Sequence, residues 1–469
     1  MRSGLFIQTG LRGVEREESL RYVSKMLPLS VVLFSNDFRD EKELAELIKK
    51  INHIYVVENN VDAPFIAVDQ EGGNVVRIPW IDYNPSNLFL GKLDDPKFTN
   101  YVGRLTGYQL NSLGIRWNLA PVLDTLNGYN PVILERSFGS DLELIAKHGV
   151  EFIRGLQSYG VRATAKHFPG HGSVMVDSHV DLPEDRRNIE SIINDAYPFR
   201  KAAEAGVSSI MLSHVLYNSL DDNYPATLSS AVQKLLRKDF NYKNLIISDS
   251  MDMKAIKGRY DVSEIIKGSI KNEVDVLENA DIVGSMEFYE EIQKIDHASL
   301  KKKEQRILEF MEPVRKMSHR PSPYLLKSVE TVSPIIRRVK MLDPEKETDL
   351  VLMDSKDESQ VAEITKSTNL VSSHLGSLNL DLKLHYGIEF LDNMKDAGRQ
   401  IIFVGRNEHL RSRVKLLNEI SERNICVFIS TSFDGDLGII SENMGYISAY
   451  SKKPSVIVGA IMKAFGFMS

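Results

Sequence analysis

The first group of residues with side chains suited to catalysis lies in a segment rich in histidine and glycine. It runs Ala165-Lys-His-Phe-Pro-Gly-His-Gly172. The proline and glycines predict a tight, exposed turn, and the apolar run before them predicts a strand that ends in Lys166 and His167. This segment would therefore supply a rigid pair of polar side chains followed by a mobile pair.

Asp177 and His179 follow in the segment Val176-Asp-Ser-His-Val180. At this spacing a turn can direct the carboxylate to one ring nitrogen, which sets the tautomer and leaves the other nitrogen for general acid/base catalysis. The alternative is a metal site made of His167, His171, Asp177 and His179, because imidazole and carboxylate groups suit zinc or iron. Their spacings match no common ligand motif, so the sequence predicts no metal.

A second segment, Leu245-Ile-Ile-Ser-Asp-Ser-Met-Asp-Met253, ends an apolar run in Asp249. A carboxylate nucleophile requires the rigid placement that a strand end provides. Asp252 is a nearby competitor for this role. An aspartate here could instead be the N-cap of the next helix.

A third segment, from Ala67 to Arg77, reads AVDQEGGNVVR and places Asp69 at the end of another apolar run. The paired glycines let a ligand approach the backbone closely. The G-x-G-x-x-G spacing of a dinucleotide site is absent. Taken alone, the segment could be a strand followed by a turn.

The elements that must position these residues alternate between short apolar runs and amphipathic stretches up to about residue 300, a pattern typical of repeated βα units. Eight parallel strands with crossover helices are expected to close into a (β/α)8 TIM barrel. Its strand ends would present Asp69, His167, His214 and Asp249 at one face, where active sites of this fold lie. The expected strands are Gly4–Gln8, Val31–Ser35, Phe65–Asp69, Arg116–Leu123, Val161–His167, Ser209–His214, Leu245–Asp249 and Val274–Leu277.

The pattern changes after about Lys303, where several prolines interrupt a basic stretch. We therefore expect a catalytic TIM barrel over residues 1–303, a linker with a helix over 304–345, and a smaller open α/β sandwich domain over 346–469. The expected elements of that domain are strands Asp349–Met353, Gln400–Val404 and Ile425–Ser430 and helices Leu410–Ile420 and Ser455–Phe465.

The composition of the 469 residues excludes several classes of protein. The net charge is -6, and Lys and Arg are mixed among Asp and Glu, so no nucleic-acid partner is expected. Cys426 is the only cysteine, which excludes an intrachain disulfide and favours a cytoplasmic location. The first residues lack the apolar stretch of a signal peptide, and no window reaches the roughly 18 apolar residues of a membrane span. We expect a monomer or homodimer with no membrane partner.

The motifs DQEGG, KHFPGHG with DSH, MLSHVLY and ISDSMDM together resemble the β-N-acetylglucosaminidase branch of family 3 glycoside hydrolases. Their order and separations agree over about residues 1–300, and the C-terminal part is loosely similar to the second domain of longer members. Two positions depart from the family pattern. Asn272-Glu273 replaces an Ala-Gly pair before the eighth strand, and Asn74 stands where basic or aromatic residues are common.

The resemblance implies a retaining, exo-acting hydrolase of terminal β-linked N-acetylglucosamine that needs no cofactor and acts on a small oligosaccharide or glycoconjugate. Asp249 would be the nucleophile, and His179, held by Asp177, the acid/base. A structural role is expected for Glu71. The residues that would bind the terminal sugar are Asp69, Arg77, Arg136, Lys166, His167 and His214.

Other functions stay open at this point. A β-glucosidase of the same family is the nearest. A phosphorylase is another, because a histidine that has given up its proton is neutral and repels phosphate less than a carboxylate does. A metal-dependent barrel hydrolase and an inactive sugar-binding protein complete the set.

Overall fold

The computed structural model forms two compact units, Met1–Glu71 with Val75–Asp82 and Asp94–Tyr324, and Gly72–Asn74 with Tyr83–Leu93 and Leu325–Ser469. The structure describes residues 2–81, 85–127, 130, 132–174, 181–312, 317–319, 321, 336–337, 348–352, 382–386, 400–405, 420, 425–430 and 444–448.

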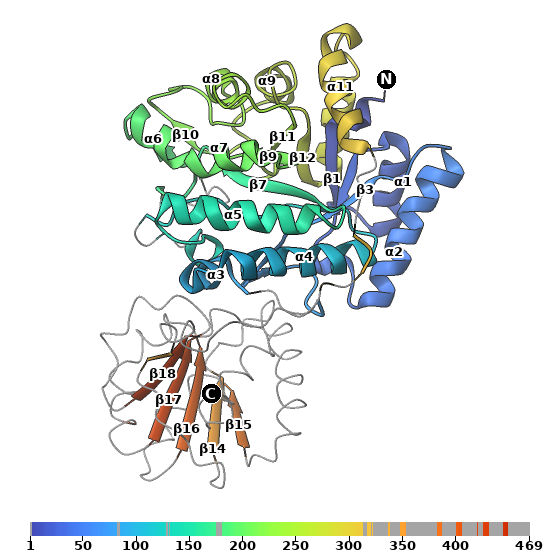
Figure 1. Ribbon diagram of the computed structural model, residues 1–469. Coiled ribbons are helices and arrows are strands. Elements are labelled where there is room, and N and C mark those ends of the chain that lie inside the picture. The colour runs from blue at the N-terminus through green and yellow to red at the C-terminus, as the bar shows by residue number, and fades with distance from the viewer. Residues whose placement is uncertain are drawn as a thin grey trace. The chain divides into compact units, whose positions relative to one another are not determined.

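The first unit is a (β/α)8 barrel, as the sequence predicts (Figure 1). Its strands are β1 (Ile7–Arg12), β2 (Ser30–Val32), β3 (Phe65–Val68), β6 (Trp117–Asn118), β7 (Arg162–Phe168), β9 (Ser209–Leu212), β11 (Leu245–Ser248) and β12 (Leu277–Asp281). All pair in parallel, in the order β11-β9-β7-β6-β3-β2-β1-β12. A parallel bridge between Ile247 and Val276 joins the two ends of the sheet.

Helices cover the outside of the barrel, and their ends follow local sequence signals. They are α1 (Arg16–Met26), α2 (Glu41–His53), α4 (Pro96–Ser112), α5 (Leu142–Gln157), α6 (Ile189–Asp195), α7 (Tyr197–Glu204), α8 (Ser230–Lys234), α9 (Val262–Gly268), α10 (Ile282–Ile292) and α11 (His297–Met311). Asp40, Asp141 and Asp261 cap α2, α5 and α9, each accepting a backbone N–H of the first turn.

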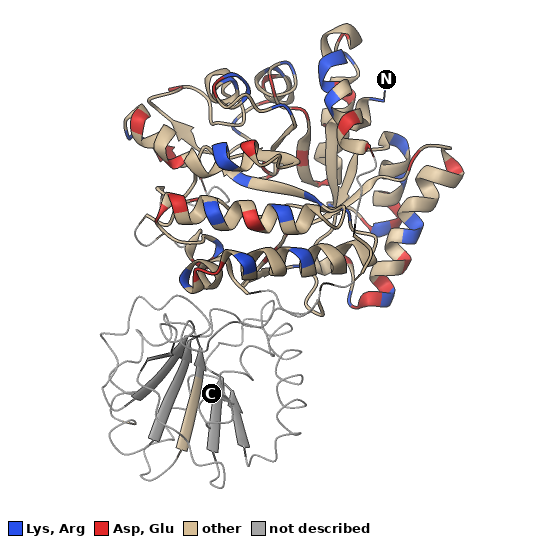
Figure 2. Ribbon diagram, in the orientation of Figure 1, with Lys and Arg blue, Asp and Glu red and all other residues tan. Residues whose placement is uncertain are grey.

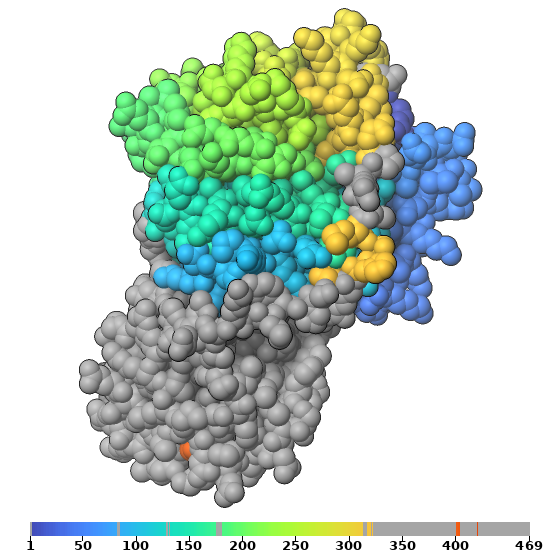
Figure 3. Space-filling view, viewed as in Figure 1, coloured from blue at the N-terminus to red at the C-terminus, as the bar shows by residue number. Residues whose placement is uncertain are grey.

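Helices α4 and α5 pack unusually closely because glycines face each other at their crossing. A Cβ added at Gly103 would lie 2.5 Å from the carbonyl oxygen of Phe152, and one at Gly155 would lie 2.3 Å from that of Asn100. The surfaces of α4, α5 and α7 lie side by side in Figure 3. Helices α5 and α7 of this layer also pack against β7, the strand that carries Lys166 and His167.

The bottom of the barrel is closed by an aromatic cluster under α11. The rings of Trp117 and Phe310 are 4.6 Å apart, and those of Phe65 and Phe310 are 5.0 Å apart. Arg162 donates to the carbonyl oxygens of Phe310, at 2.6 Å, and Glu312, at 2.8 Å, so it caps the last turn of α11. This helix runs through Lys303, the end of the expected barrel domain, because its apolar face continues to pack on the strands.

Every expected barrel strand overlaps an observed one, but several boundaries are wrong. Residues Ser3–Phe6 form a 3₁₀ helix, so the first strand begins at Ile7 and not at Gly4. The last strand is Leu277–Asp281, later than the expected Val274–Leu277. Apolar runs mark buried backbone, and buried backbone at the end of a barrel need not be strand.

The second unit contains a six-stranded sheet of order β13-β18-β17-β16-β14-β15 (Figure 1). All its pairs are parallel except β13 with β18. Its strands are β13 (Ile336–Arg337), β14 (Thr348–Leu352), β15 (Leu382–Tyr386), β16 (Gln400–Gly405), β17 (Ile425–Ser430) and β18 (Met444–Ser448). In β16 the consecutive residues Ile401, Ile402 and Phe403 are all buried, as expected for a parallel strand covered on both faces.

The three strands expected in this unit overlap β14, β16 and β17 to within one residue at each end, whereas the sequence predicts none of β13, β15 and β18. The expected helices Leu410–Ile420 and Ser455–Phe465 lie outside the described residues, apart from Ile420. On the barrel helices, acidic and basic side chains alternate without a large region of one sign (Figure 2). None of the helices in the described part of the chain is long and apolar enough to span a membrane.

Candidate active site

The ends of the barrel strands gather the polar side chains that the sequence analysis singled out. The four residues of β11 are buried, and Asp249 follows them directly. Its backbone N–H donates to the carbonyl oxygen of Leu212 at 3.1 Å, which extends the pairing with β9 by one residue. Its side chain is 17% exposed, so the carboxylate is held firmly and still reaches solvent.

Asp249 is held in its ionised form by its surroundings. Burial raises the pKa of a carboxyl group, but the charges of His167 and His214, the backbone N–H of Ser250 and the charge of Lys166 together lower the pKa of Asp249 below its usual value. The Ser250 N–H donates to Asp249 Oδ1 at 2.8 Å, and His167 Nε2 lies 4.0 Å from Asp249 Oδ2. Such a carboxylate is available to attack an electrophile near neutral pH.

Asp252 is not the equivalent of Asp249. It accepts the hydroxyl of Ser250 at 2.6 Å and lies in the turn beyond the strand. The helix-cap alternative is wrong for both aspartates, because the next helix, α9, begins at Val262 and is capped by Asp261.

A chain of ion pairs lies at the ends of β3 and β7. Lys166 Nζ is 2.7 Å from Asp69 Oδ1 and 2.6 Å from Glu71 Oε1. Arg136 forms a bidentate ion pair with the Glu71 carboxylate: its Nε lies 2.8 Å from Oε2 and its Nη2 lies 2.9 Å from Oε1. Burial would raise the pKa of Glu71, but Arg136 and Lys166 hold it far below the usual range. Glu71 thus pairs with two cations at once and fixes their positions, which is the kind of structural role expected for it.

Arg77 extends this chain toward solvent. Its guanidinium lies 3.8 Å from Asp69 Oδ2 and 5.6 Å from the centre of the Phe34 ring, and the side chain is 30% exposed. Asp69 therefore has a cation on either side, Lys166 buried and Arg77 half-buried. A carboxylate held in this way can accept hydrogen bonds from the hydroxyl groups of a ligand, while the cations donate to the same groups.

Asp124 is a site residue that the sequence analysis missed. It is completely buried and accepts the backbone N–H of His171 at 2.7 Å and that of His167 at 3.2 Å. It also lies 2.7 Å from His167 Nδ1, so this nitrogen carries a proton and Nε2 is directed toward Asp249. Burial raises the pKa of Asp124, but the charge and hydrogen bond of His167 together with the contributions of His171 lower this pKa below its usual value. The signal was available, since Asp124 directly follows the expected strand Arg116–Leu123.

His171 is buried, and neither of its ring nitrogens has a hydrogen-bond partner among the residues that the structure describes. Its ring lies 6.1 Å from that of His167. Burial lowers the pKa of His171 to about 4, so the ring is neutral at neutral pH. In the described part of the chain, no group of three His, Cys, Asp or Glu side chains is arranged to hold a metal ion. Two of the four residues of the metal alternative, Asp177 and His179, lie outside the described residues.

His214 supports the turn that carries the nucleophile candidate. Its Nε2 lies 3.0 Å from the carbonyl oxygen of Ser250, and its Nδ1 lies 2.8 Å from Thr227 Oγ1. His214 thus contacts the residue after Asp249, and it is fully buried.

The loop after β7 begins with a constrained turn. A Cβ at Gly172 would lie 1.6 Å from the carbonyl oxygen of Thr125, so only glycine fits. The Asn130 amide donates to the carbonyl oxygens of Gly172 and Val174, at 3.1 and 2.8 Å. Asp177 and His179, the expected acid/base pair, follow this anchored start and lie outside the described residues.

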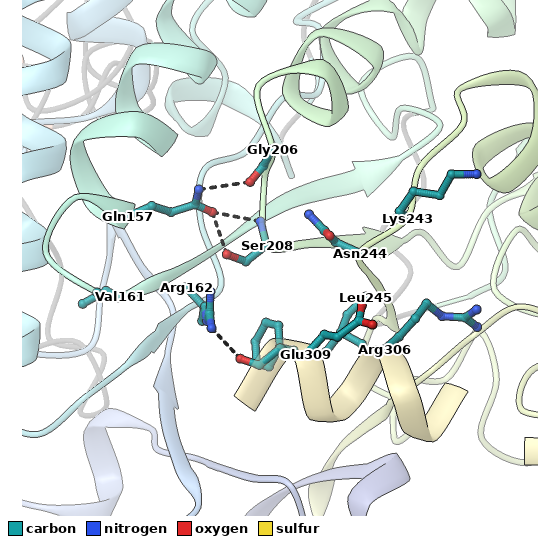
Figure 4. Close-up of a pocket in the computed structure, with 12 residues that line it drawn as sticks. Gln157, Val161, Arg162, Gly206, Ser208, Lys243, Asn244, Leu245, Arg306 and Glu309 are labelled. Atoms are coloured by element: carbon teal, nitrogen blue, oxygen red, sulfur yellow. Dashed lines mark hydrogen bonds between the residues drawn. The ribbon is translucent and has the colours of Figure 1, made fainter. Parts of the chain in front are cut away.

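A pocket of about 230 Å³ lies at the opposite end of the barrel, where β7, β9 and β11 begin (Figure 4). Several of its polar groups make bonds within the protein: Gln157 is hydrogen-bonded to Gly206 and Ser208, and Arg306 pairs with Asp275. The pocket contains none of the candidate site residues at the strand ends and is not the candidate active site.

The chain has clear relatives. The Glycosyl hydrolase family 3 N terminal domain matches residues 10–310. A β-hexosaminidase of Thiobacillus denitrificans is 36% identical over 247 residues, 50% of this chain and 67% of that protein. A structure of a family 3 β-N-acetylglucosaminidase from Paenibacillus sp. str. FPU-7 is similar with a TM-score of 0.80 and 24% identity, over 100% of this chain and 96% of that one. NagZ from Neisseria gonorrhoeae is similar with a TM-score of 0.57 and 28% identity, over 66% of this chain and 90% of that one.

Proposed function

The chain belongs to glycosyl hydrolase family 3, and from this premise we propose that it is a retaining β-N-acetylglucosaminidase. It removes terminal β-linked N-acetylglucosamine from a small oligosaccharide or glycoconjugate. The β-hexosaminidases among its relatives, such as that of Thiobacillus denitrificans, support this choice of substrate class.

One observation carries the proposal. Asp249, an ionised and partly exposed carboxylate at a strand end, lies 4.0 Å from His167, and Lys166 beside that histidine pairs with Asp69. A nucleophile and the polar groups that would hold sugar hydroxyls therefore share one face of the barrel, although they come from distant parts of the chain.

In the first step, Asp249 attacks the anomeric carbon and the bond to the leaving oxygen breaks. His179, oriented by Asp177, donates its proton to that oxygen. Asp69, Arg77, Lys166 and His167 hold the sugar, while Arg136 fixes Glu71 behind them. The transition state resembles an oxocarbenium ion, so the negative charge of Asp249 stabilises it before the covalent bond forms.

In the second step, the neutral His179 takes a proton from water. The resulting hydroxide attacks the anomeric carbon, and the bond to Asp249 breaks. Two inversions give net retention of configuration. Retaining glycosidases ordinarily use two carboxyl groups, and here the Asp177/His179 pair takes the place of the second.

The proposal is tested with purified protein and 4-nitrophenyl β-N-acetylglucosaminide. We expect release of nitrophenol, β-anomeric product by NMR at early times, and a fluorinated substrate analogue bound covalently to the peptide containing Asp249. Preference for 4-nitrophenyl β-glucoside would instead indicate a β-glucosidase. Formation of sugar 1-phosphate when phosphate is added would indicate a phosphorylase, and inhibition by a chelator would indicate the metal-dependent alternative.

A cytoplasmic location is part of the proposal. The single cysteine, Cys426, supports it, because disulfides are rare in the cytosol. Fractionation of cells that express the full-length protein tests it, and recovery outside the cytoplasmic fraction would overturn it.

A further inference from the structure

Glu278 is a buried carboxyl group beside the candidate nucleophile that the mechanism above does not use. It lies in β12, is 4% exposed, and its backbone N–H donates to Ser248 Oγ at 2.9 Å. In the described part of the chain, no Lys, Arg or His side chain pairs with it. A buried carboxyl group without a cation requires another way to balance its charge.

The hydrogen bonds of Ser250 show where a proton must lie. The Ser250 hydroxyl has one proton and two acceptor sites. It lies 2.6 Å from Asp252 Oδ1 and 3.2 Å from Glu278 Oε1, and it accepts the backbone N–H of Ala280 at 3.1 Å. Its single proton goes to the nearer carboxylate, that of Asp252. The contact with Glu278 is then a hydrogen bond only if Glu278 supplies the proton.

The charges around Glu278 also favour its protonated form. Burial, followed by the negative charges of Asp249, Asp69 and Asp252, raises the pKa of Glu278 well above its usual value. Its register neighbour on β1, Gln8, carries no charge. The carboxylic acid form therefore adds no further negative charge beside those of Asp249, Asp69 and Asp252.

Ser250 connects Glu278 to the nucleophile candidate. Its backbone N–H donates to Asp249 Oδ1 at 2.8 Å, and the next residue, Met251, donates its N–H to the carbonyl oxygen of Glu278 at 3.0 Å. The turn after β11 is thus fixed to β12 through both a side chain and the backbone. A substitution at Glu278 would therefore affect the position of Asp249 through a single intervening residue, Ser250.

We propose that Glu278 is a positioning residue that acts as a neutral carboxylic acid, donating to Ser250 Oγ and so fixing the turn that orients Asp249. The role in catalysis rests on the function proposed above. The protonated state of Glu278 does not, and it can be measured without a substrate.

The test compares three variants with the wild type. Glu278→Gln keeps a neutral donor, so kcat should stay within about threefold of wild type. Glu278→Leu removes the donor, so kcat should fall about 10- to 100-fold with KM within about twofold, because a loosened nucleophile affects the reaction more than binding. Glu287→Gln, the same substitution at an exposed position of α10, is the control and should leave both constants unchanged.

Difference infrared spectroscopy of wild type against Glu278→Gln at pH 7, without substrate, gives the independent readout. We expect a protonated carboxylic acid C=O band that the variant lacks. Absence of this band, or a Gln variant as slow as the Leu variant, would overturn the inference. A wild type without glycosidase activity would overturn the proposed function instead, while the infrared band still decides the state of Glu278.

Discussion

Replacing His171 with Asn tests how the loop after β7 responds to pH. The imidazole of His171 is buried, and its two ring nitrogens have no hydrogen-bond partner within the described ranges of the chain. Asp124 accepts its backbone N–H. A proton added to this ring in the folded protein would place a charge in a buried site, where the cost of desolvation outweighs the attraction of Asp124 and Asp249. The unfolded chain has no such restriction and binds the proton as free histidine does.

The size of the effect follows from the pKa of His171. This pKa is 6.5 in the unfolded reference and about 4 in the folded protein, where burial lowers it most, and the difference corresponds to about 3 kcal/mol. Above pH 6.5 both states are neutral and His171 adds no pH dependence. As the pH falls from 6.5 to 4, the unfolded state binds the proton first, so the folded state loses stability across that window.

The measurement is urea unfolding at several pH values between 4.5 and 7.5, followed by tryptophan fluorescence. Both tryptophans, Trp80 and Trp117, belong to the barrel unit, so the signal reports that unit alone. The free energy of unfolding of His171→Asn minus that of wild type should rise by roughly 2–3 kcal/mol as the pH falls from 7 to 4.5. His53→Asn, the same substitution at an exposed position, controls for the loss of an ordinary histidine.

A difference between His171→Asn and wild type that is independent of pH would refute this reasoning. It would mean that the folded protein protonates His171 as readily as the unfolded chain does. A pH-independent offset is expected in addition, because the smaller side chain leaves a cavity.

Four further substitutions test the site. Asp249→Asn should reduce kcat at least about 10³-fold, measured with the nitrophenyl substrate, because the amide cannot form the glycosyl-enzyme, and a smaller loss would exclude it as nucleophile. Asp124→Asn should lower kcat/KM about 10- to 100-fold, because the amide no longer fixes the His167 ring, and an unchanged value would refute this role. Glu71→Gln should lower the free energy of unfolding by about 3–5 kcal/mol in urea at pH 7, since it removes the buried carboxylate that pairs with both Arg136 and Lys166, and a loss below about 1 kcal/mol would contradict the stabilising role of this pairing. His179→Ala should slow substrates with poor leaving groups far more than nitrophenyl glycosides, and equal losses on both would exclude it as the acid.

The sequence predicts the part of the site that lies at strand ends. Asp69, Lys166, His167 and Asp249 are each preceded by an apolar run, and the barrel brings such ends to one face whatever the intervening loops do. The position of His214 could be predicted in the same way, because it too follows an apolar run. The contact of His214 with Ser250 could not be predicted from the sequence, because it depends on the turn beyond β11.

Pairs that form across strands could not be predicted. Glu71 and Arg136 are 65 residues apart, and nothing in either segment shows that they meet. Asp124 follows an expected strand, but its role depends on hydrogen bonds to residues 43 and 47 positions later. Glu278 was missed because the expected last strand ended one residue before it. Periodicity identifies burial well and boundaries poorly, and a one-residue error is enough to lose a site residue.

The pairing of β1 with β12 has a consequence for synthesis on the ribosome. Strand β1 begins at Ile7, and its partner β12 ends at Asp281. The edge of β1 that pairs with β12 therefore stays open until both strands have been synthesised. At about 5–20 residues per second, translation of this stretch takes roughly 14 to 55 s. During that interval the nascent chain carries an unpaired edge of a strand that is almost wholly buried in the folded protein, and such an edge is a template for aggregation and a binding site for chaperones.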